Sequence, residues 1–503
     1  MIPMKDNQNV NNTNMRPTGL RADESIDTRL DIDINALIDS VLRHRQESPV
    51  VRTASVTELQ AAIPQAMPEA GMDLDDVVNE VKAVVETYMR KNSHPGFYGY
   101  IASPALATDP ASHALTAALN QNVVGYPGAP GAATIERTVI RWMTELMGYP
   151  STADGVFLSG GSMANFSALA AALYDSLGVD AINDGLSLES EKGRPMIFAA
   201  YSVHFSIQRA AVLLGIGKNS VKTIATDQSF CLQATELDKA LTESKKNGEL
   251  PFCVVATAGS TTTGTIDPID EIANVCQQHD VWLHVDAAYG AAAMMSKELR
   301  PQFSGIEKSD SIAMDLHKWF YMAFAGSILL YKNPASARQV FFQQSDYVQF
   351  PKEGTPEQHM FFHLSPELSR RFRALPAYIA LRYYGIERLG RNVYHNFECA
   401  RYLAALVKDH ENLKLLNEPA LSICCFRFID STLTSEQTDM VNTTIRQQLE
   451  QEGDFYLSAT DMDDRPVLRV CICSHTTRPQ HMEDLVDAVV RVGQKLIGEI
   501  SIA

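Results

Sequence analysis

The chain has 503 residues, 45% of them hydrophobic and 20% charged, and its formal net charge is −17. This length can bury a large core, and the composition is typical of a globular protein rather than a fibrous one. The acidic charge is spread along the chain and argues against a nucleic-acid or anionic-membrane partner. No segment is long and apolar enough to span a bilayer, so we expect no membrane partner.

Residues 1–30 are polar and rich in asparagine, which predicts a disordered leader. They contain no apolar segment like that of a signal peptide. The eight cysteines include no Cys-x-x-Cys pair, and most lie in apolar runs, as buried thiols do in a reducing compartment. We therefore expect a cytoplasmic protein without a disulfide framework or a metal site.

The predicted elements change character along the chain. Over residues 31–91 apolar side chains recur at helical spacing, which predicts an N-terminal helical segment. From 92 to 390 we expect a large domain, because short apolar strands alternate with helices there, as in a mainly parallel sheet covered on both faces. Residues 391–503 predict a small α+β domain. The predicted strands are Gly155–Leu158, Met196–Ala200, Phe252–Ala256, Trp282–Val285, Ser311–Met314, Ser327–Tyr331, Ser422–Phe428 and Val467–Cys473.

One predicted strand ends in the sequence Asp315-Leu316-His317-Lys318-Trp319. This spacing places a lysine at a strand end beside an imidazole and an indole. Loss of water there lowers the pKa of a lysine and frees its amine for imine chemistry. The structural alternative is a surface lysine that happens to follow a strand.

Asp286 follows another apolar strand and precedes Ala287 and Ala288. Ligands of open α/β sheets bind at the carboxyl edge of the strands, and the two alanines leave room there for a flat molecule. A carboxylate in that place can keep a proton on a pyridine nitrogen. Alternatively, Asp286 caps the turn that follows.

Two further strand ends carry polar groups. Gly160-Gly161-Ser162 precedes an alanine-rich helix, where backbone N–H groups and the serine hydroxyl can bind a phosphate. This turn is not a Walker loop, since no Gly-Lys-Ser/Thr follows. His204 opens the helix after the strand Met196–Ala200, where an imidazole can stack on an aromatic cofactor or serve a structural role.

Along the chain these features follow in the order phosphate turn, stacking histidine, carboxylate and lysine. In this order the chain resembles the group II pyridoxal-phosphate decarboxylases of fold type I, and most of all the aromatic-L-amino-acid decarboxylases. The resemblance implies an α/β fold with a mainly parallel, seven-stranded central sheet, and a homodimer with active sites at the interface. It covers roughly residues 92–390. The matching segments are His94-Pro95, Ser159–Asn165, Tyr201–Ala210, Ala256–Asp267, His284–Tyr289, Ser309–Trp319 and Ser369–Leu375.

The resemblance implies a role for each matching residue. Lys318 carries pyridoxal 5′-phosphate as a Schiff base, Asp286 pairs with the pyridine nitrogen, and His204 stacks on the ring, with Ala288 beneath its other face. Ser260 replaces the first threonine of a Gly-Thr-Thr segment that commonly faces the cofactor. The residues at or near the phosphate are Gly161, Ser162, Asp315 and His317.

The segment from His94 to Tyr100 resembles the one that lines the side-chain pocket of aromatic decarboxylases. We therefore predict that His94, Phe97, Tyr98 and Tyr100 line the substrate pocket, although core packing is an alternative for Phe97. The pattern favours an aromatic L-amino acid (tryptophan, phenylalanine, tyrosine or DOPA) as the small-molecule partner. An acidic or diamino acid is the other substrate class.

Aromatic decarboxylases commonly return the proton from a tyrosine on a mobile loop upstream of a segment that is Arg370–Arg373 here. By spacing, that position falls on Phe361 or Phe362, with Tyr347 the nearest upstream tyrosine. A phenylalanine cannot donate a proton. In relatives, loss of the tyrosine hydroxyl is associated with oxidative decarboxylation–deamination to an aldehyde, which is the alternative reaction.

Two other activities remain open from the sequence. An aminotransferase would need an arginine in the C-terminal domain for the substrate carboxylate, and Arg427 and Arg469 both lie in predicted strands there. A binding protein that keeps the fold without catalysis is the other possibility, although a complete set of lysine, aspartate and histidine speaks against it.

Overall fold

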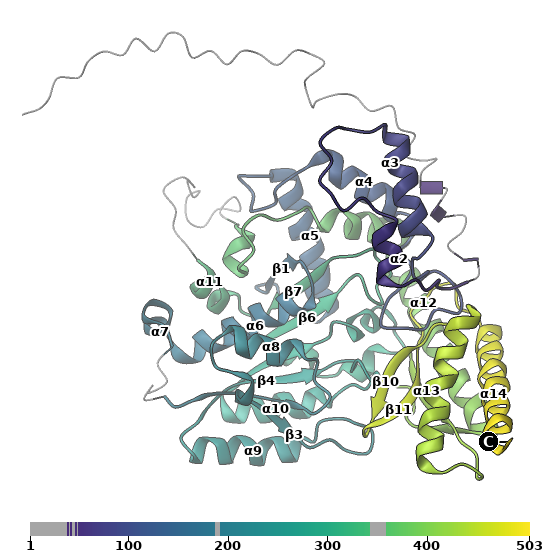
Figure 1. The fold of residues 1–503 in the computed structure, drawn as a ribbon. Coiled ribbons are helices and arrows are strands. Elements are labelled where there is room, and N and C mark those ends of the chain that lie inside the picture. The colour runs from purple at the N-terminus through teal and green to yellow at the C-terminus, as the bar shows by residue number, and fades with distance from the viewer. Residues whose placement is uncertain are drawn as a thin grey trace, which may run out of the picture. The chain divides into compact units, whose positions relative to one another are not determined.

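The computed structural model describes residues 38–39, 41–42, 46–47, 49–186, 192–342 and 359–502 (Figure 1). The predicted leader and Tyr347 lie outside these ranges. Residues 1–44 form a unit of their own, and the fold described below belongs to residues 45–503.

A seven-stranded sheet in the order β1-β7-β6-β5-β4-β2-β3 forms the centre of the large domain. Strands β2 to β6 pair in parallel, and β7 is antiparallel to its neighbours β1 and β6, which confirms the predicted mainly parallel sheet. The strands are β1 (Asp154–Leu158), β2 (Pro195–Ala200), β3 (Val221–Ile224), β4 (Leu250–Thr257), β5 (Trp282–Asp286), β6 (Ser311–Asp315) and β7 (Ser327–Tyr331).

Helices cover both faces of this sheet, as Figure 1 shows for α6 and α8 on one side and α9 and α10 on the other. The alternation of side chains along β2 explains this arrangement. Ile197 packs in one cluster with Ile207 of α8, whereas the next residue, Phe198, packs in another with Leu237 of α9. The helices are α5 (Pro130–Leu146), α6 (Gly161–Leu177), α7 (Val179–Asp184), α8 (Ser206–Leu213), α9 (Ala234–Lys246), α10 (Ile269–His279) and α11 (Ala335–Phe341).

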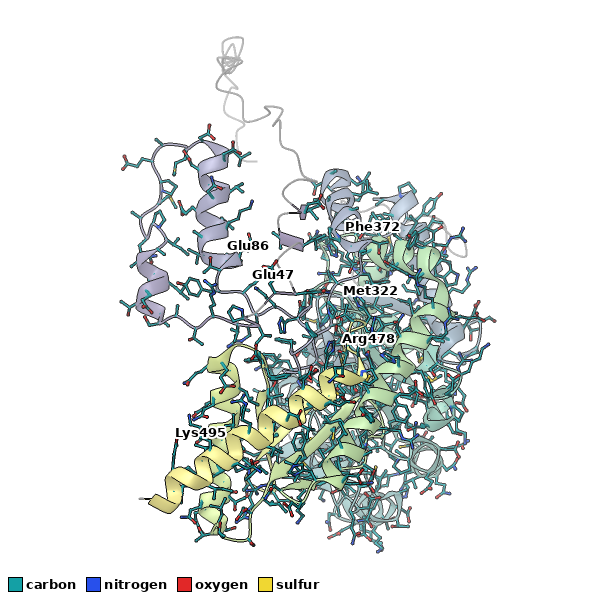
Figure 2. The ribbon with its side chains drawn as sticks, turned by 90° about the vertical axis from the view of Figure 1, so that its right-hand side faces the viewer. Glu47, Glu86, Met322, Phe372, Arg478 and Lys495 are labelled. Carbon is teal, nitrogen blue, oxygen red and sulfur yellow. The ribbon has the colours of Figure 1, made fainter. Side chains whose placement is uncertain are left out.

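The C-terminal part builds a second, antiparallel sheet in the order β10-β11-β9-β8. Helix α12 runs across the predicted boundary at residue 390, with non-helical backbone at Gly385. In Figure 2, α14 crosses the front of the molecule between the labels of Arg478 and Lys495. The elements are α12 (Ala374–Asp409), β8 (Leu413–Leu415), β9 (Ile423–Phe428), α13 (Ser435–Glu452), β10 (Ser458–Met462), β11 (Arg465–Cys471) and α14 (Pro479–Ile502).

The described N-terminal helices contain no buried residue. α2 (Val56–Ala61), α3 (Leu74–Val81) and a π-helical turn (Lys82–Glu86) lie within residues 52–90, all of them described, and none of these residues is buried. Figure 2 shows α2 and α3 standing apart from the sheets, with Glu86 at the end of the second helix. Helix α4 (Asp109–Leu119) then leads back to the large domain.

Candidate active site

A cavity of about 250 Å³ lies at the carboxyl ends of β4, β5 and β6, beside the start of α6. All the predicted catalytic and cofactor-binding residues except Ser260 line it. The topology explains this, because the carboxyl ends of parallel strands meet at one edge of a sheet. The described residues that line the cavity are Gly161, Ser162, Asn165, Ser202, His204, Thr257, Gly259, Thr261, Asp286, Ala288, Tyr289, Asp315, His317 and Lys318.

Lys318 is paired with a carboxylate in this structure. Its Nζ lies 2.9 Å from Oδ2 of Asp315, whose Oδ1 accepts a hydrogen bond from the Ser327 hydroxyl. Burial lowers the pKa of Lys318, but the carboxylates of Asp315 and Asp286 outweigh burial and raise that pKa above its ordinary value. The expected lowering of the pKa is therefore wrong for the polypeptide alone, because the sequence did not show how close Asp315 comes.

Asp286 is held by fixed donors at the end of β5. Its Oδ2 accepts a hydrogen bond from Asn165 Nδ2 at 2.9 Å, and its Oδ1 accepts one from the backbone N–H of Ala288 at 3.1 Å. The side chain of Asn165 is 1% exposed. The Asp286 carboxylate is therefore fixed in position before any ligand binds.

A chain of hydrogen bonds decides which way Asn165 points. Ser311 Oγ accepts a hydrogen bond from the indole N–H of Trp282 (2.9 Å) and lies 2.9 Å from His284 Nδ1, to which its hydroxyl can donate. Burial lowers the pKa of His284 to about 4, so its ring is neutral and donates from Nε2 to Asn165 Oδ1 (3.0 Å). The Asn165 amide therefore turns its N–H groups towards Asp286. The sequence did not single out Asn165 and His284, although both stand inside matching segments.

His204 lies between β2 and α8 and is oriented by Ser206. Its Nδ1 is 2.7 Å from Ser206 Oγ, which also accepts a hydrogen bond from Asn165 Nδ2 at 2.9 Å. The Ser206 hydroxyl is thus free to donate to Nδ1, which leaves the His204 proton on Nε2. Burial lowers the pKa of His204, which favours this neutral form.

The predicted phosphate turn opens α6 without a side-chain cap. The N–H groups of a first helical turn have no partner inside the helix and are suited to an anion. A Cβ at Gly161 would lie 2.9 Å from Asp315 Oδ2, so this close approach requires glycine. His317 Nδ1 is within 3.2 Å of both backbone groups of Gly326, which fixes the ring beside the turn.

The segment after β4 carries hydroxyls with different roles. Thr257 Oγ1 is buried without a hydrogen-bond partner among the described residues, and Thr257 lines the cavity. Ser260 Oγ instead lies 2.7 Å from Thr263 Oγ1 and 3.2 Å from Thr265 Oγ1, within its own turn. An unpartnered hydroxyl, a carboxylate and an open helix start around one small cavity fit a flat polar ring with a phosphate tail, and pyridoxal 5′-phosphate has this form.

None of the four predicted substrate-pocket residues lines this cavity. His94 lines a separate, open cleft of about 800 Å³ together with Asp454, His481 and Asp484. Phe97 stacks on Tyr456 with ring centroids 5.3 Å apart, which is the core-packing alternative. The fully buried Tyr98 belongs to the core of the C-terminal part.

Tyr100 does not line the cavity but is tied to it through Arg469. Its carbonyl accepts a hydrogen bond from Arg469 Nη1 at 3.0 Å, and Arg469 Nε donates to the carbonyl of Thr261 at 2.9 Å. Tyr100 as a whole is 52% exposed. Arg427, the other arginine considered, forms an ion pair with Asp439.

The two phenylalanines at the predicted proton-donor position lie outside the cavity. Phe361 is fully buried, with the Arg370 guanidinium 4.7 Å from its ring centre, and Arg370 forms a buried ion pair with Glu136. Phe362 packs edge-on against His363, with ring centroids 4.4 Å apart.

Among the residues that the structure describes, no group of three or more histidine, cysteine, aspartate or glutamate side chains could hold a metal ion. Similarly, no helix in the described part of the chain is long and apolar enough to cross a membrane.

Comparison with known proteins agrees with this geometry. The family model "Pyridoxal-dependent decarboxylase conserved domain" matches residues 57–429. An aromatic-L-amino-acid decarboxylase of Bacillus atrophaeus is 27% identical over 98% of each chain, and an L-2,4-diaminobutyrate decarboxylase of Acinetobacter baumannii is 26% identical over 90% of each. The crystal structure of Oryza sativa TDC with PLP and tryptamine shares the fold, with a TM-score of 0.86 and 22% identity over 93% of this chain and all of that one. The chain thus belongs to the pyridoxal-dependent decarboxylase family and is a pyridoxal 5′-phosphate-dependent amino-acid decarboxylase.

Proposed function

We propose that the enzyme decarboxylates an aromatic L-amino acid (tryptophan, phenylalanine, tyrosine or DOPA) to the amine and CO₂. The observation that carries this proposal is the single cavity in which Lys318, Asp286 and His204 meet. Among the described residues that line it there is no arginine to receive a second carboxylate, which favours an aromatic over an acidic side chain. Tyr100 is half-exposed, and Arg469 joins its backbone carbonyl to that of Thr261 at the cavity wall, so its ring is suited to contact such a side chain.

In this proposal each residue of the cavity has one task towards the cofactor. When bound, pyridoxal 5′-phosphate supplies the electron sink that stabilises the carbanion left by CO₂. Lys318 holds it covalently, and Asp286, oriented by Asn165, keeps a proton on its ring nitrogen. The first turn of α6 and His317 bind its phosphate. Thr257 Oγ1 offers a hydrogen bond that no described group uses.

The polypeptide also orients the substrate and carries protons. The ring of His204 is fixed by Ser206, so its Nε2–H can direct a substrate carboxylate. Tyr289 lines the cavity, but its hydroxyl lies 2.5 Å from Ser422 Oγ and accepts the Ser422 N–H. Burial raises the pKa of Tyr289 well above its ordinary value, so this tyrosine is a poor proton donor. Lys318 and His204 are better placed to return a proton within the described part of the site.

A second reaction is suggested by the lack of a hydroxyl at the expected donor position. Phe361 and Phe362 cannot return a proton, so within the described part of the site this step would depend on Lys318 and His204. Oxidative decarboxylation–deamination is therefore the alternative that we propose on the same scaffold: O₂ and water would be consumed, and the aldehyde, CO₂, ammonia and hydrogen peroxide would be released.

We also propose that the enzyme is a homodimer. Leu74, Val77, Val78 and Val81 recur at helical spacing on α3, yet no residue of 52–90 is buried within its own chain. An amphipathic arm of this kind gains stability by packing its apolar side chains on another surface. A second copy of the chain would supply that surface.

The oligomeric state tests this dimer directly. The full chain should sediment as a dimer at micromolar concentration, and combined Val77→Asp and Val81→Asp substitutions should shift it towards the monomer. Asp75→Asn on the polar side of α3 serves as the matched control and should not. A wild-type chain that is fully active as a monomer would rule the dimer out.

We place the enzyme in the cytoplasm. All eight cysteines are free thiols in the structure, as expected of a chain kept in a reducing compartment. The location of a tagged full-length chain in fractionated cells tests this placement.

The substrate and the product are tested together. Purified holoenzyme is incubated with aromatic, acidic and diamino L-amino acids while CO₂, amine, aldehyde and hydrogen peroxide are measured. The proposal expects CO₂ and amine in equal amounts from an aromatic substrate. Aldehyde with peroxide would instead support the oxidative alternative, and turnover of only acidic or diamino acids would overturn the aromatic assignment.

A further inference from the structure

Two cysteines behind the cofactor cavity lie in contact with each other. Cys471 ends β11 and Cys473 stands two residues later, so both side chains point to the same side of the chain. Their Sγ atoms are 3.4 Å apart, and both residues are buried as free thiols. No function described above uses this pair.

The pair is one residue layer away from the cavity. Cys473 Sγ lies 3.9 Å from Ser422 Oγ, and Ser422 binds the hydroxyl of Tyr289, which lines the cavity. The backbone on either side is also held, because Cys471 N–H donates to the carbonyl of Tyr98 and Ile472 N–H donates to that of Ser422. A shift of this strand end would therefore displace Tyr289.

The charges around Cys471 favour its thiolate. Burial raises the pKa of Cys471, but the contact with the Cys473 thiol and the positive charges of Arg469 and Lys318 outweigh it and lower that pKa. A thiolate is the nucleophilic form of cysteine, and a second thiol at contact distance is the group that resolves its oxidation.

The backbone separation is compatible with a bond between the two sulfurs. Residues i and i+2 of an extended strand lie roughly 6.6 Å apart, within the range of Cα–Cα distances in disulfides. The sulfurs would have to close from 3.4 Å to about 2.0 Å, which requires the strand end to move.

We propose that Cys471 and Cys473 form a modification site for hydroperoxides, and that closing it to a disulfide switches the Lys318 site off. Cys471 loses its proton, its thiolate attacks one oxygen of hydrogen peroxide, the O–O bond breaks, and the departing hydroxide combines with the released proton to give water. Cys473 then attacks the resulting sulfenic acid, the S–O bond breaks, and a second water leaves. Peroxide gains two electrons and the two thiols lose them. A dithiol reductant reverses the modification.

The expected effect is a loss of turnover through displacement of Tyr289 and Arg469. Arg469, two residues before Cys471, bridges the carbonyls of Thr261 and Tyr100 beside the cavity. A displacement of this wall by a fraction of an ångström should lower kcat/KM roughly 10- to 100-fold. The inference does not depend on which amino acid is the substrate.

The experiment treats the holoenzyme with hydrogen peroxide, removes the oxidant, and measures CO₂ release before and after dithiothreitol. The tryptic peptide that starts at Val470 contains both cysteines and no other, so an internal disulfide makes it lighter by two hydrogen atoms. We expect the loss of turnover to follow the amount of this lighter peptide and dithiothreitol to restore it. Cys471→Ala and Cys473→Ala should abolish the reversible loss, each compared with its own reduced form.

Cys231→Ala is the matched control, because Cys231 is the one cysteine that is not buried and it lies outside the cavity. This variant should respond to peroxide as the wild type does. A reversible loss of the same size in Cys473→Ala would overturn the proposal. So would a wild-type enzyme whose Val470 peptide stays reduced while Cys231 is oxidised, a result that needs no variant to fold.

Discussion

Two pockets of this molecule contain histidines and carboxylates, but only one of them is organised for chemistry. The Lys318 cavity has about 250 Å³, and its Asp286 carboxylate accepts hydrogen bonds from Asn165 and from a backbone N–H. The open cleft at His94 has about 800 Å³ and places His481 and Asp484 side by side. Size therefore does not identify the active site. The Lys318 cavity is distinguished by fixed hydrogen-bond donors around a buried charge, because such donors need not reorient during the reaction.

The largest effect is expected at the centre of the fixed network. Asp286→Asn keeps the shape of the side chain but removes the charge that would hold a proton on the cofactor. We expect kcat/KM for CO₂ release to fall about 100- to 1,000-fold. Asp280→Asn is the control, since Asp280 is exposed at the end of α10 and its left-handed backbone suits asparagine. A drop of similar size in the control would contradict this assignment.

A smaller effect should follow when Asp286 stays and its support is removed. Asn165→Ala leaves Oδ2 of Asp286 without its side-chain donor. Removing a residue that orients a functional side chain in this way lowers activity about 10- to 100-fold. In the open cleft, His481→Ala should change kcat/KM by less than about twofold, as at most surface positions. A larger drop in kcat/KM for His481→Ala than for Asn165→Ala would contradict this difference between the two pockets.

The smallest effect concerns a buried carboxylate that accepts a hydrogen bond from a backbone N–H. Asp109 Oδ2 accepts a hydrogen bond from the Ala323 N–H at 2.6 Å, while Oδ1 has no partner among the described residues. Burial raises the pKa of Asp109 from 3.8 to about 6. The folded state thus binds this proton more tightly than the unfolded state does. The protonated carboxyl group therefore contributes its full stabilisation below about pH 4, and this stabilisation is lost as the pH rises through 6.

Asp109→Asn removes this pH dependence. Between pH 5 and pH 8 the free energy of unfolding of the variant should therefore gain about 1.4 kcal/mol relative to the wild type. Urea unfolding at both pH values measures the difference, with the exposed Asp75→Asn as control. Parallel pH profiles for Asp109→Asn and the wild type would show that Asp109 is not held in its protonated form.

The sequence predicted the buried strands well, including the edge strand β1, and the more exposed edge strands poorly. β2, β4, β5 and β6 are buried apolar runs, and such runs are visible in the sequence. The edge strand β3 was missed because the polar residues Lys222 and Thr223 break its apolar pattern. β10 was missed for the same reason, since only its first residue is buried.

The site was predictable wherever a residue ends a strand, because the parallel topology brings those ends to one edge. Contacts that depend on distance were not predictable. The approach of Asp315 to Lys318 reverses the expected change in the lysine pKa, and the hydrogen-bond chain from Trp282 to Asn165 links residues far apart in sequence. The segment from His94 to Tyr100 matched a substrate pocket, yet its side chains pack in three different places within the single chain.

One measurement tests the role of Lys318 most directly. Borohydride fixes pyridoxal phosphate covalently to the lysine that carries it, and peptide mass spectrometry then locates the modified residue. The cavity geometry predicts that the cofactor is found on Lys318 and that Lys318→Ala loses both the modification and CO₂ release, whereas the exposed Lys297→Ala loses neither. Cofactor fixed to a different lysine, or a Lys318→Ala enzyme that releases CO₂ at the normal rate, would contradict it.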